Sequence, residues 1–191
     1  MKSPSPTATA SARGMWIALI LVLCLFLVPY GAGLFLGDEF EGAVTTELAA
    51  EPQAVWDALY DHRSHPLSGG AVVSVVDLAP TAVGPAWEER MERAALRVET
   101  LVAEPPRRLS RRAHDEANGV ESTWTYALEA TEAGTALRIH QEMRVTNPGF
   151  SAPYFRLAVE VLDFARQAPR DAVLSIADGL GLPEPVVVPA D

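Results

Sequence analysis

The chain of 191 residues contains one cysteine, Cys24, and one lysine, Lys2. A lone cysteine cannot form an intramolecular disulfide, so a small fold held together by disulfides is excluded. Cys24 also does not fit a bacterial lipoprotein acceptor, because Leu23 precedes it where a small residue is needed. We therefore interpret Cys24 as an ordinary apolar residue of the segment that surrounds it.

Positive charge is scarce over the whole chain. Acidic residues outnumber Lys and Arg, and the net charge is −10. The densest basic stretch, residues 107–112, is followed closely by Asp115 and Glu116. A surface of this kind repels phosphate backbones, so the composition predicts that nucleic acid is not a partner.

The sequence signatures of common catalytic and cofactor sites are missing as well. No serine lies in a nucleophile elbow, and no phosphate-binding glycine loop follows a predicted strand. His62 and His65 are three residues apart, but a closed zinc site needs about four ligands and the neighbouring sequence does not complete it. His114 and His140 have no partner in the sequence that would make either a general base. We therefore predict no metal, no cofactor and no catalytic residue.

Charge is entirely absent from residues 15–37. As a helix this segment would be about 34 Å long, against about 30 Å for the hydrocarbon core of a bilayer. The apolar region of a secretory signal is shorter, about 7–15 residues. We therefore predict an uncleaved transmembrane helix over 15–37, with a signal cleaved near residues 31–33 as the alternative. Residues 1–14 are rich in Ser, Thr, Pro and Ala, which predicts a disordered leader.

The charges that flank this segment predict its orientation. Lys2 and Arg13 precede it. Three acidic residues follow it, namely Asp38, Glu39 and Glu41. Because positive residues favour the inner side, we predict a single-pass protein of the cell membrane with a cytoplasmic N-terminus and an extracytoplasmic domain. Gly33 and Gly37 have the spacing of a helix-dimerisation motif, but one pair at a helix end is weak evidence, so the oligomeric state stays open.

The residues after the apolar segment have the size and composition of one soluble domain. Alternation of apolar and polar residues from Phe40 predicts a strand that ends before Pro52. Pro52 suits the first turn of a helix, and the apolar residues after it recur at helical spacing. These residues are Val55, Trp56, Leu59 and Tyr60. Further strands are predicted at 71–78, 86–91 and 96–103.

Residues 108–116 suggest an edge strand, because charges recur there without a clear apolar face. The strongest strand signals are 122–130 and 135–145, and the turn at 131–134 places Gly134 at the tight position of a hairpin. One face of this hairpin is apolar and the other is charged, so the apolar face needs a cover. The charged face carries Arg138, His140, Glu142 and Arg144.

A helix from about residue 153 to 179 provides that cover. Its predicted apolar stripe consists of Phe155, Val159, Leu162, Ala165, Val173, Ile176 and Ala177. We expect Pro169 to kink or split this helix near Arg166, and Gly179 to end it. Residues 183–191 then form a C-terminal tail. The elements together predict an α+β fold.

This order of elements resembles the START-like (SRPBCC) superfamily, also described as polyketide cyclase/dehydratase-like or helix-grip proteins. The likeness is carried by AAEPQAVWDALYD, WEERM, EPPRRL, GTALRI and LSIADGLG, and it spans about residues 40–180. It implies a helix-grip domain over 38–182, in which a curved antiparallel sheet wraps around the C-terminal helix. It also implies an internal apolar cavity, since members of the family bind lipids, quinones, polyketides and other hydrophobic molecules.

Strand parity and helix spacing predict which residues line that cavity. They are Trp87, Trp124, Tyr126, Ile139, Gln141, Met143, Phe155, Val159 and Leu162. Glu89 shares a strand face with Trp87, which leaves two interpretations of it, a buried carboxylate or a solvated acid at a strand edge. We expect the solvated acid. In the resembling family the stretch 61–65 lies near the cavity mouth, which suggests a gate.

Three functions are compatible with these features. The first, which we favour, is a membrane-anchored, non-catalytic protein that binds a hydrophobic small molecule or lipid. The second is a cyclase- or dehydratase-like enzyme, which needs an ionisable group aimed into the cavity, and Glu89 is the one candidate that the sequence offers. The third is an interaction domain whose charged row of Arg138, His140 and Glu142 binds another envelope protein.

Overall fold

A computed structural model describes residues 12–68, 71–147 and 149–190, so most of the predicted leader lies outside the described residues. The helices are α1 (Ala12–Leu34), α2 (Pro52–Tyr60), α3 (Ala152–Val161) and α4 (Phe164–Gly179). The strands are β1 (Glu39–Leu48), β2 (Ser74–Asp77), β3 (Ala86–Arg90), β4 (Ala95–Glu104), β5 (Arg108–Asp115), β6 (Val120–Thr131), β7 (Gly134–Val145) and β8 (Val188–Pro189). In the described part of the chain these strands form one sheet in the order β2-β3-β4-β5-β6-β7-β1-β8.

Antiparallel pairing joins every neighbouring pair of strands, and the predicted hairpin lies inside the sheet, between β5 and β1. Strands β6 and β7 pair from Val120 with Val145 to Thr131 with Gly134. Gly134 has φ of 143°, a backbone conformation that residues with a Cβ rarely adopt. The alternation of buried and exposed residues along β7 puts one face against the core.

The position of β5 corrects the prediction for residues 108–116. This strand lies between β4 and β6 and is not at an edge. Leu109, Arg111 and Ala113 all point to the core and are 0–1% exposed. The apolar alternation was present, but an arginine at its central position concealed it.

The C-terminal helical region is broken at a different place from the predicted one. Asp163 adopts a left-handed conformation with φ of 51° and separates α3 from α4, while Pro169 lies inside α4 without splitting it. Leu162, next to the break, is 61% exposed and so does not continue the buried stripe. Proline at 169 deprives the Ala165 carbonyl of its usual helical donor. That carbonyl faces Gly42 of β1, where a Cβ would overlap it. The absence of a side chain at Gly42 therefore allows the backbone of α4 to approach the strand closely.

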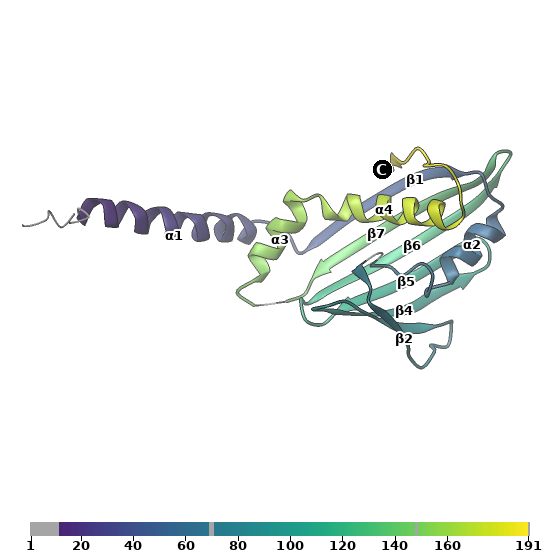
Figure 1. Cartoon of the computed structure of the whole chain (residues 1–191), viewed down its shortest axis with the longest axis horizontal. Coiled ribbons are helices and arrows are strands. Elements are labelled where there is room, and N and C mark those ends of the chain that lie inside the picture. The colour runs from purple at the N-terminus through teal and green to yellow at the C-terminus, as the bar shows by residue number, and fades with distance from the viewer. Residues whose placement is uncertain (1–11, 69–70, 148, 191) are drawn as a thin grey trace, which may run out of the picture.

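The main core lies between the sheet and the pair of helices α2 and α4, and Figure 1 shows α4 lying along β1 and β7. Buried residues of α2 and α4 meet buried residues of β5, β6 and β7. The cluster includes Val55, Trp56, Leu59, Leu109, Tyr126, Leu137, Ile139, Val173, Ile176 and Ala177. The predicted α+β helix-grip architecture is therefore confirmed.

The C-terminal tail adds a short strand to the sheet. Val188 and Pro189 pair with Thr45 and Val44 of β1. The hydroxyl of Thr46 donates a hydrogen bond to the carbonyl of Val186 (2.9 Å). The tail therefore covers part of the edge that β1 would otherwise expose.

Helix α1 extends away from the domain, with α3 beside its end (Figure 1). The described residues contain one helical segment, Gly14–Leu34, that is long enough and apolar enough to cross a membrane. Membrane anchors and signal sequences share this property. The hydroxyl of Tyr154 in α3 donates to the carbonyl of Phe26 (2.9 Å). Gly33 is buried against the Pro153 carbonyl, so α3 of the same chain occupies this part of the predicted dimerisation motif.

Candidate ligand-binding site

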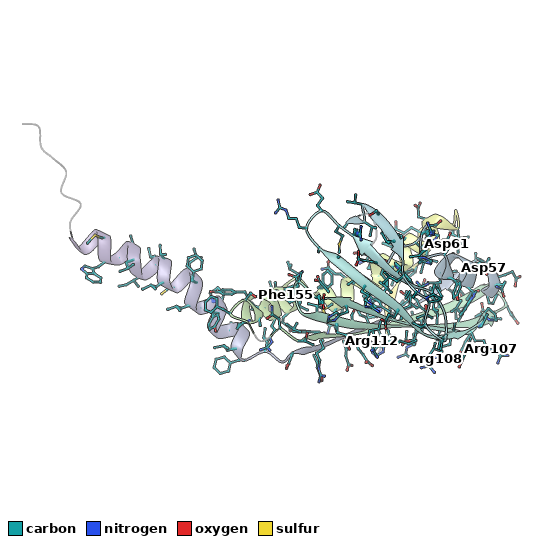
Figure 2. All side chains as sticks on the ribbon, turned by 90° about the horizontal axis from the view of Figure 1, so that it is seen from below. Asp57, Asp61, Arg107, Arg108, Arg112 and Phe155 are labelled. Atoms are coloured by element: carbon teal, nitrogen blue, oxygen red, sulfur yellow. The ribbon has the colours of Figure 1, made fainter. Side chains whose placement is uncertain are left out.

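A pocket of about 490 Å³ lies between β6, β7 and α3, and we call it the apolar pocket. Alternate residues of the two strands face the helix, and residues four apart on α3 face the strands. Six of the nine predicted lining residues meet here, namely Trp124, Gln141, Met143, Phe155, Val159 and Leu162. Figure 2 shows Phe155 at the end of the domain next to α1. These six residues therefore share one hollow, while their binding role stays a prediction.

A second pocket of about 430 Å³, the polar pocket, lies between α4, the end of α2 and the residues that follow α2. Its polar lining residues are His65, Ser68, Arg111, Tyr126, Gln167, Asp171 and Ser175. Leu67, Ser68, Phe164 and Ala168 line both pockets, so the two adjoin under α4. The combined site has an apolar part near α3 and a polar part near α2.

The remaining three predicted lining residues lie elsewhere along the same strands. Tyr126 lines the polar pocket, and burial raises the pKa of its hydroxyl to about 12, so it is a neutral phenol. Trp87 and Ile139 line neither pocket and are 0% exposed. Ile139 belongs to the main core, while Trp87 packs with Val98 and Ala113 in a smaller cluster.

Arg111 is a pocket-lining residue that the sequence interpretation missed. Its side chain is buried, and its Nη2 donates to the carbonyl of Leu59 at the end of α2 (2.7 Å). The guanidinium lies over the ring of Trp87, 4.8 Å from the ring centre. Its buried Nε has no hydrogen-bond partner. Burial lowers the pKa of Arg111, because the charged form loses its hydration there.

Glu89 is buried, so the expected solvated acid is wrong. The side chain is 0% exposed, because residues 67–68 and Trp87 enclose its carboxylate. Its carboxylate accepts hydrogen bonds from the backbone N–H groups of Leu67 (2.7 Å) and Ser68 (2.9 Å) and from the indole N–H of Trp87 (2.9 Å). These donors replace the water that burial removes. Glu89 lines neither pocket, so its observed role is to hold residues 67–68 against β3.

The loop after α2, predicted to be a gate, is held against β2 and β3 by His62 and Arg63. The ring of His62 stacks on Trp87 at 4.5 Å, and its Nε2 lies 3.0 Å from Asp77 Oδ1. Arg63 forms an ion pair with the same carboxylate. Hydrogen bonds from His62 and Arg63 lower the pKa of Asp77. Opening of this loop stays a prediction.

His65 closes the polar pocket on the side of α4. Its ring packs against Gly179, where a Cβ would overlap it. Its Nδ1 is buried and has no hydrogen-bond partner. The part of the chain that the structure describes holds no group of three or more metal-ligating side chains. His65 and Arg111 therefore both line this pocket, and each has a buried nitrogen without a protein partner.

Comparison with known proteins gives matches among solved structures alone. No family model matches the chain, and no curated protein matches it. A hypothetical protein from Helicobacter pylori is 14% identical, with a TM-score of 0.55 over 75% of this chain and 88% of that one. A protein from Rhodobacter sphaeroides is 21% identical, with a TM-score of 0.51 over 74% of this chain and 91% of that one.

A third similar structure is the di-domain ARO/CYC StfQ from the steffimycin biosynthetic pathway. It is 13% identical, with a TM-score of 0.54, and the match covers 89% of this chain and 61% of StfQ. At such identities the similarity shows the fold alone. It agrees with the helix-grip arrangement of sheet and C-terminal helix described above.

Proposed function

We propose, from the premise that this chain has the START-like helix-grip fold, that it binds a hydrophobic small molecule or lipid beside a membrane. The observation that carries the proposal is the apolar pocket of about 490 Å³ between the hairpin and α3. Ligand sites in proteins have volumes of about 300–1,000 Å³ and mostly apolar walls with a few polar groups. The apolar pocket and the polar pocket together have this character.

The chemistry of the walls favours an apolar ligand in the part near α3. Trp124, Met143 and Val159 supply aromatic, thioether and branched aliphatic surface. The polar lining residues are few, and one of them, Gln141, has a buried Oε1 without a hydrogen-bond partner. Burial of a ligand's apolar surface against these side chains contributes about 25 cal/mol per Å² before the costs of association.

The membrane anchor is part of the same proposal. The apolar side chains of α1 are exposed, with Leu25 at 69% and Val28 at 66%. A continuous apolar surface of this kind needs a partner, and a bilayer suits its length. The flanking charges favour an extracytoplasmic domain. Since α3 both lines the apolar pocket and packs on α1, the pocket lies at the end of the domain next to α1, which supports a ligand that comes from the bilayer.

Binding of an apolar fluorescent probe tests the proposal. The full chain is placed in nanodiscs, and binding of N-phenyl-1-naphthylamine is measured above the background of empty nanodiscs. Val159→Phe fills the apolar pocket, so we expect it to weaken probe binding about tenfold, equivalent to 1.4 kcal/mol. Val161→Phe is the matched control, because Val161 is 71% exposed on the same helix and lines neither pocket.

Native mass spectrometry of the extracted full chain gives a second readout. We expect a lipid-sized mass to accompany the wild-type chain and to be lost in Val159→Phe. Equal probe binding by both phenylalanine variants and the wild type would contradict the proposal.

The two alternative functions have less support from the geometry. The enzyme hypothesis relied on Glu89, which accepts three hydrogen bonds from the protein and lines neither pocket. The interaction hypothesis relied on the outer row of Arg138, His140 and Glu142. His140 and Glu142 approach each other to 3.8 Å on that face, which is compatible with a partner but does not select one.

A further inference from the structure

We infer that the polar pocket is a carboxylate site, so that the ligand is a single-chain amphiphile with its acid head on Arg111 and its hydrocarbon chain in the apolar pocket. The inference rests on the proposed function and specifies its ligand class. The two pockets share four lining residues, so one molecule can occupy both. Such a molecule would be long, with a polar end in the polar pocket and a hydrocarbon chain in the apolar pocket.

The first step of the argument concerns the charge of Arg111. A buried cation is stable where hydrogen bonds or an opposite charge replace its hydration. Across residues 12–68, 71–147 and 149–190, no carboxylate forms an ion pair with Arg111. Glu89 affects the pKa of Arg111, but its oxygens accept hydrogen bonds from Leu67, Ser68 and Trp87. The guanidinium is therefore only partly compensated by the protein.

The second step concerns unused donors. Arg111 carries five N–H donors in a planar fork that matches a carboxylate. One terminal nitrogen donates to Leu59, and the buried Nε has no partner. His65 Nδ1 is also buried without a partner on the wall of the same pocket. Arg111 therefore lines this hollow as a buried guanidinium whose donors the protein uses only in part, which suits an oxyanion.

The remaining titratable wall residues do not compete for this role. Tyr126 is a neutral phenol at physiological pH, since burial raises its pKa to about 12. Asp171 of α4 lines the pocket but is exposed, and it makes no ion pair in the described residues. A second explanation for Arg111 is purely structural, because it also holds the last turn of α2 and lies over Trp87. The test must separate these two roles.

Matched ligands separate them in the full chain in nanodiscs. Palmitate and 1-hexadecanol have the same chain length and differ in the head group, and each is titrated against bound N-phenyl-1-naphthylamine. We expect the wild-type chain to bind palmitate at least about tenfold more tightly than hexadecanol, as expected for a charge-assisted hydrogen bond. Equal affinities for the two would overturn the inference, and this comparison requires no variant.

Variants then assign the preference to Arg111. We expect Arg111→Gln to weaken palmitate about tenfold while hexadecanol binds as before. Arg112→Gln is the control, because Arg112 faces the opposite side of β5, is 46% exposed and lies 4.0 Å from Glu121 (Figure 2). An equal loss for both ligands in Arg111→Gln would show a structural role and overturn the inference. Thermal unfolding verifies that each variant is folded.

Two further outcomes are informative. Lysophosphatidic acid binding more tightly than palmitate would replace the carboxylate by a phosphate and overturn the assignment of the head group. If the probe and hexadecanol bind but palmitate has no advantage, only this inference fails. If the probe itself does not bind above empty nanodiscs, the proposed function fails with it.

Discussion

Arg111 and Glu89 are two buried charged residues that meet the same ring. The guanidinium lies over Trp87, and the indole N–H of Trp87 donates to Glu89. A buried charge needs replacements for its lost water. Glu89 finds three donors inside the protein, whereas Arg111 keeps an unpartnered Nε. The hydrogen-bonding needs of Glu89 are therefore met by the protein alone, whereas Arg111 has a donor left over that suits a ligand.

The satisfied state of Glu89 leads to a stability prediction. In Glu89→Gln an amide NH₂ replaces one acceptor oxygen, so a backbone N–H of Leu67 or Ser68 is left without a partner. We expect a loss of about 2 kcal/mol in the free energy of unfolding, the typical cost of an unsatisfied buried donor. The measurement is chemical denaturation of the full chain in nanodiscs, followed by circular dichroism.

The neighbouring acid provides the control for this change. Glu88→Gln alters an exposed ion pair with Arg90, which contributes at most about 1 kcal/mol. An unfolding midpoint for Glu89→Gln that equals the midpoint of Glu88→Gln would contradict the role of Glu89 described above.

At the scale of elements, α4 contacts β1 where the Ala165 carbonyl lies against Gly42. Gly42 allows the Ala165 carbonyl to approach the strand, and Pro169 is the residue that leaves this carbonyl without a helical donor. We predict that Gly42→Ala displaces α4, because the new Cβ would overlap the Ala165 carbonyl. The expected loss of stability is about 1–3 kcal/mol, as for other overpacked sites.

Thermal unfolding of the full chain measures this effect. Gly31→Ala is the matched control, since a Cβ there meets nothing within 4 Å. We expect the control to leave the melting temperature close to that of the wild type. A melting temperature for Gly42→Ala equal to that of the control would mean that α4 is not held by this contact.

The elements that could be predicted from the sequence are those whose side chains alternate without interruption. The hairpin of β6 and β7 was predicted with its turn, because hydrophobic alternation and Gly134 agree there. The place of β5 inside the sheet was not predicted, because Arg111 faces the core at a site that usually carries an apolar residue. The helix break was misplaced, since proline indicates where a helix loses a hydrogen bond but not whether a neighbouring strand accommodates the freed carbonyl.

The candidate site was predictable in its apolar half only. Parity on the strands and spacing on α3 identified Trp124, Met143 and Val159 as neighbours, and all three line one pocket. Parity fixes the face of a residue but not its position along the sheet, which is why Trp87 and Ile139 lie in packed regions. The polar half combines a loop residue, His65, with Arg111, and no local pattern relates the two.

At the scale of the whole molecule, the contact between α3 and α1 fixes the distance of the domain from the proposed membrane. Phe26, whose carbonyl accepts the Tyr154 hydrogen bond, precedes the end of α1 by eight residues. Eight residues of helix correspond to about 12 Å along its axis. Tyr30 stacks on Phe150 at 4.7 Å in the same region. Gly33, one residue before the end of α1, lies against the Pro153 carbonyl, so the backbone at the start of α3 lies near the outer end of α1 if α1 spans the bilayer, while the Tyr154 side chain reaches inward to Phe26.

Site-directed spin labels test this depth. In a Cys24→Ser background, one label is attached at Ser151→Cys, at the start of α3, and a control label at Glu132→Cys, in the turn between β6 and β7. We expect oxygen, which concentrates in lipid, to relax the first label more strongly, and a water-soluble nickel chelate to relax the second. Similar accessibility of both labels to the nickel chelate would place the whole domain in water, away from the bilayer.

The left-handed residue Asp163 has a mechanical consequence. It stands between α3, which packs on α1, and α4, which packs on β1, so the geometry of this one junction sets the angle between the two helices. A spanning helix tilts more in a thinner bilayer. Such a tilt would pass through α3 into the wall that carries Phe155 and Val159. Under the proposed membrane location, the shape of the apolar pocket would therefore respond to the thickness of the surrounding bilayer.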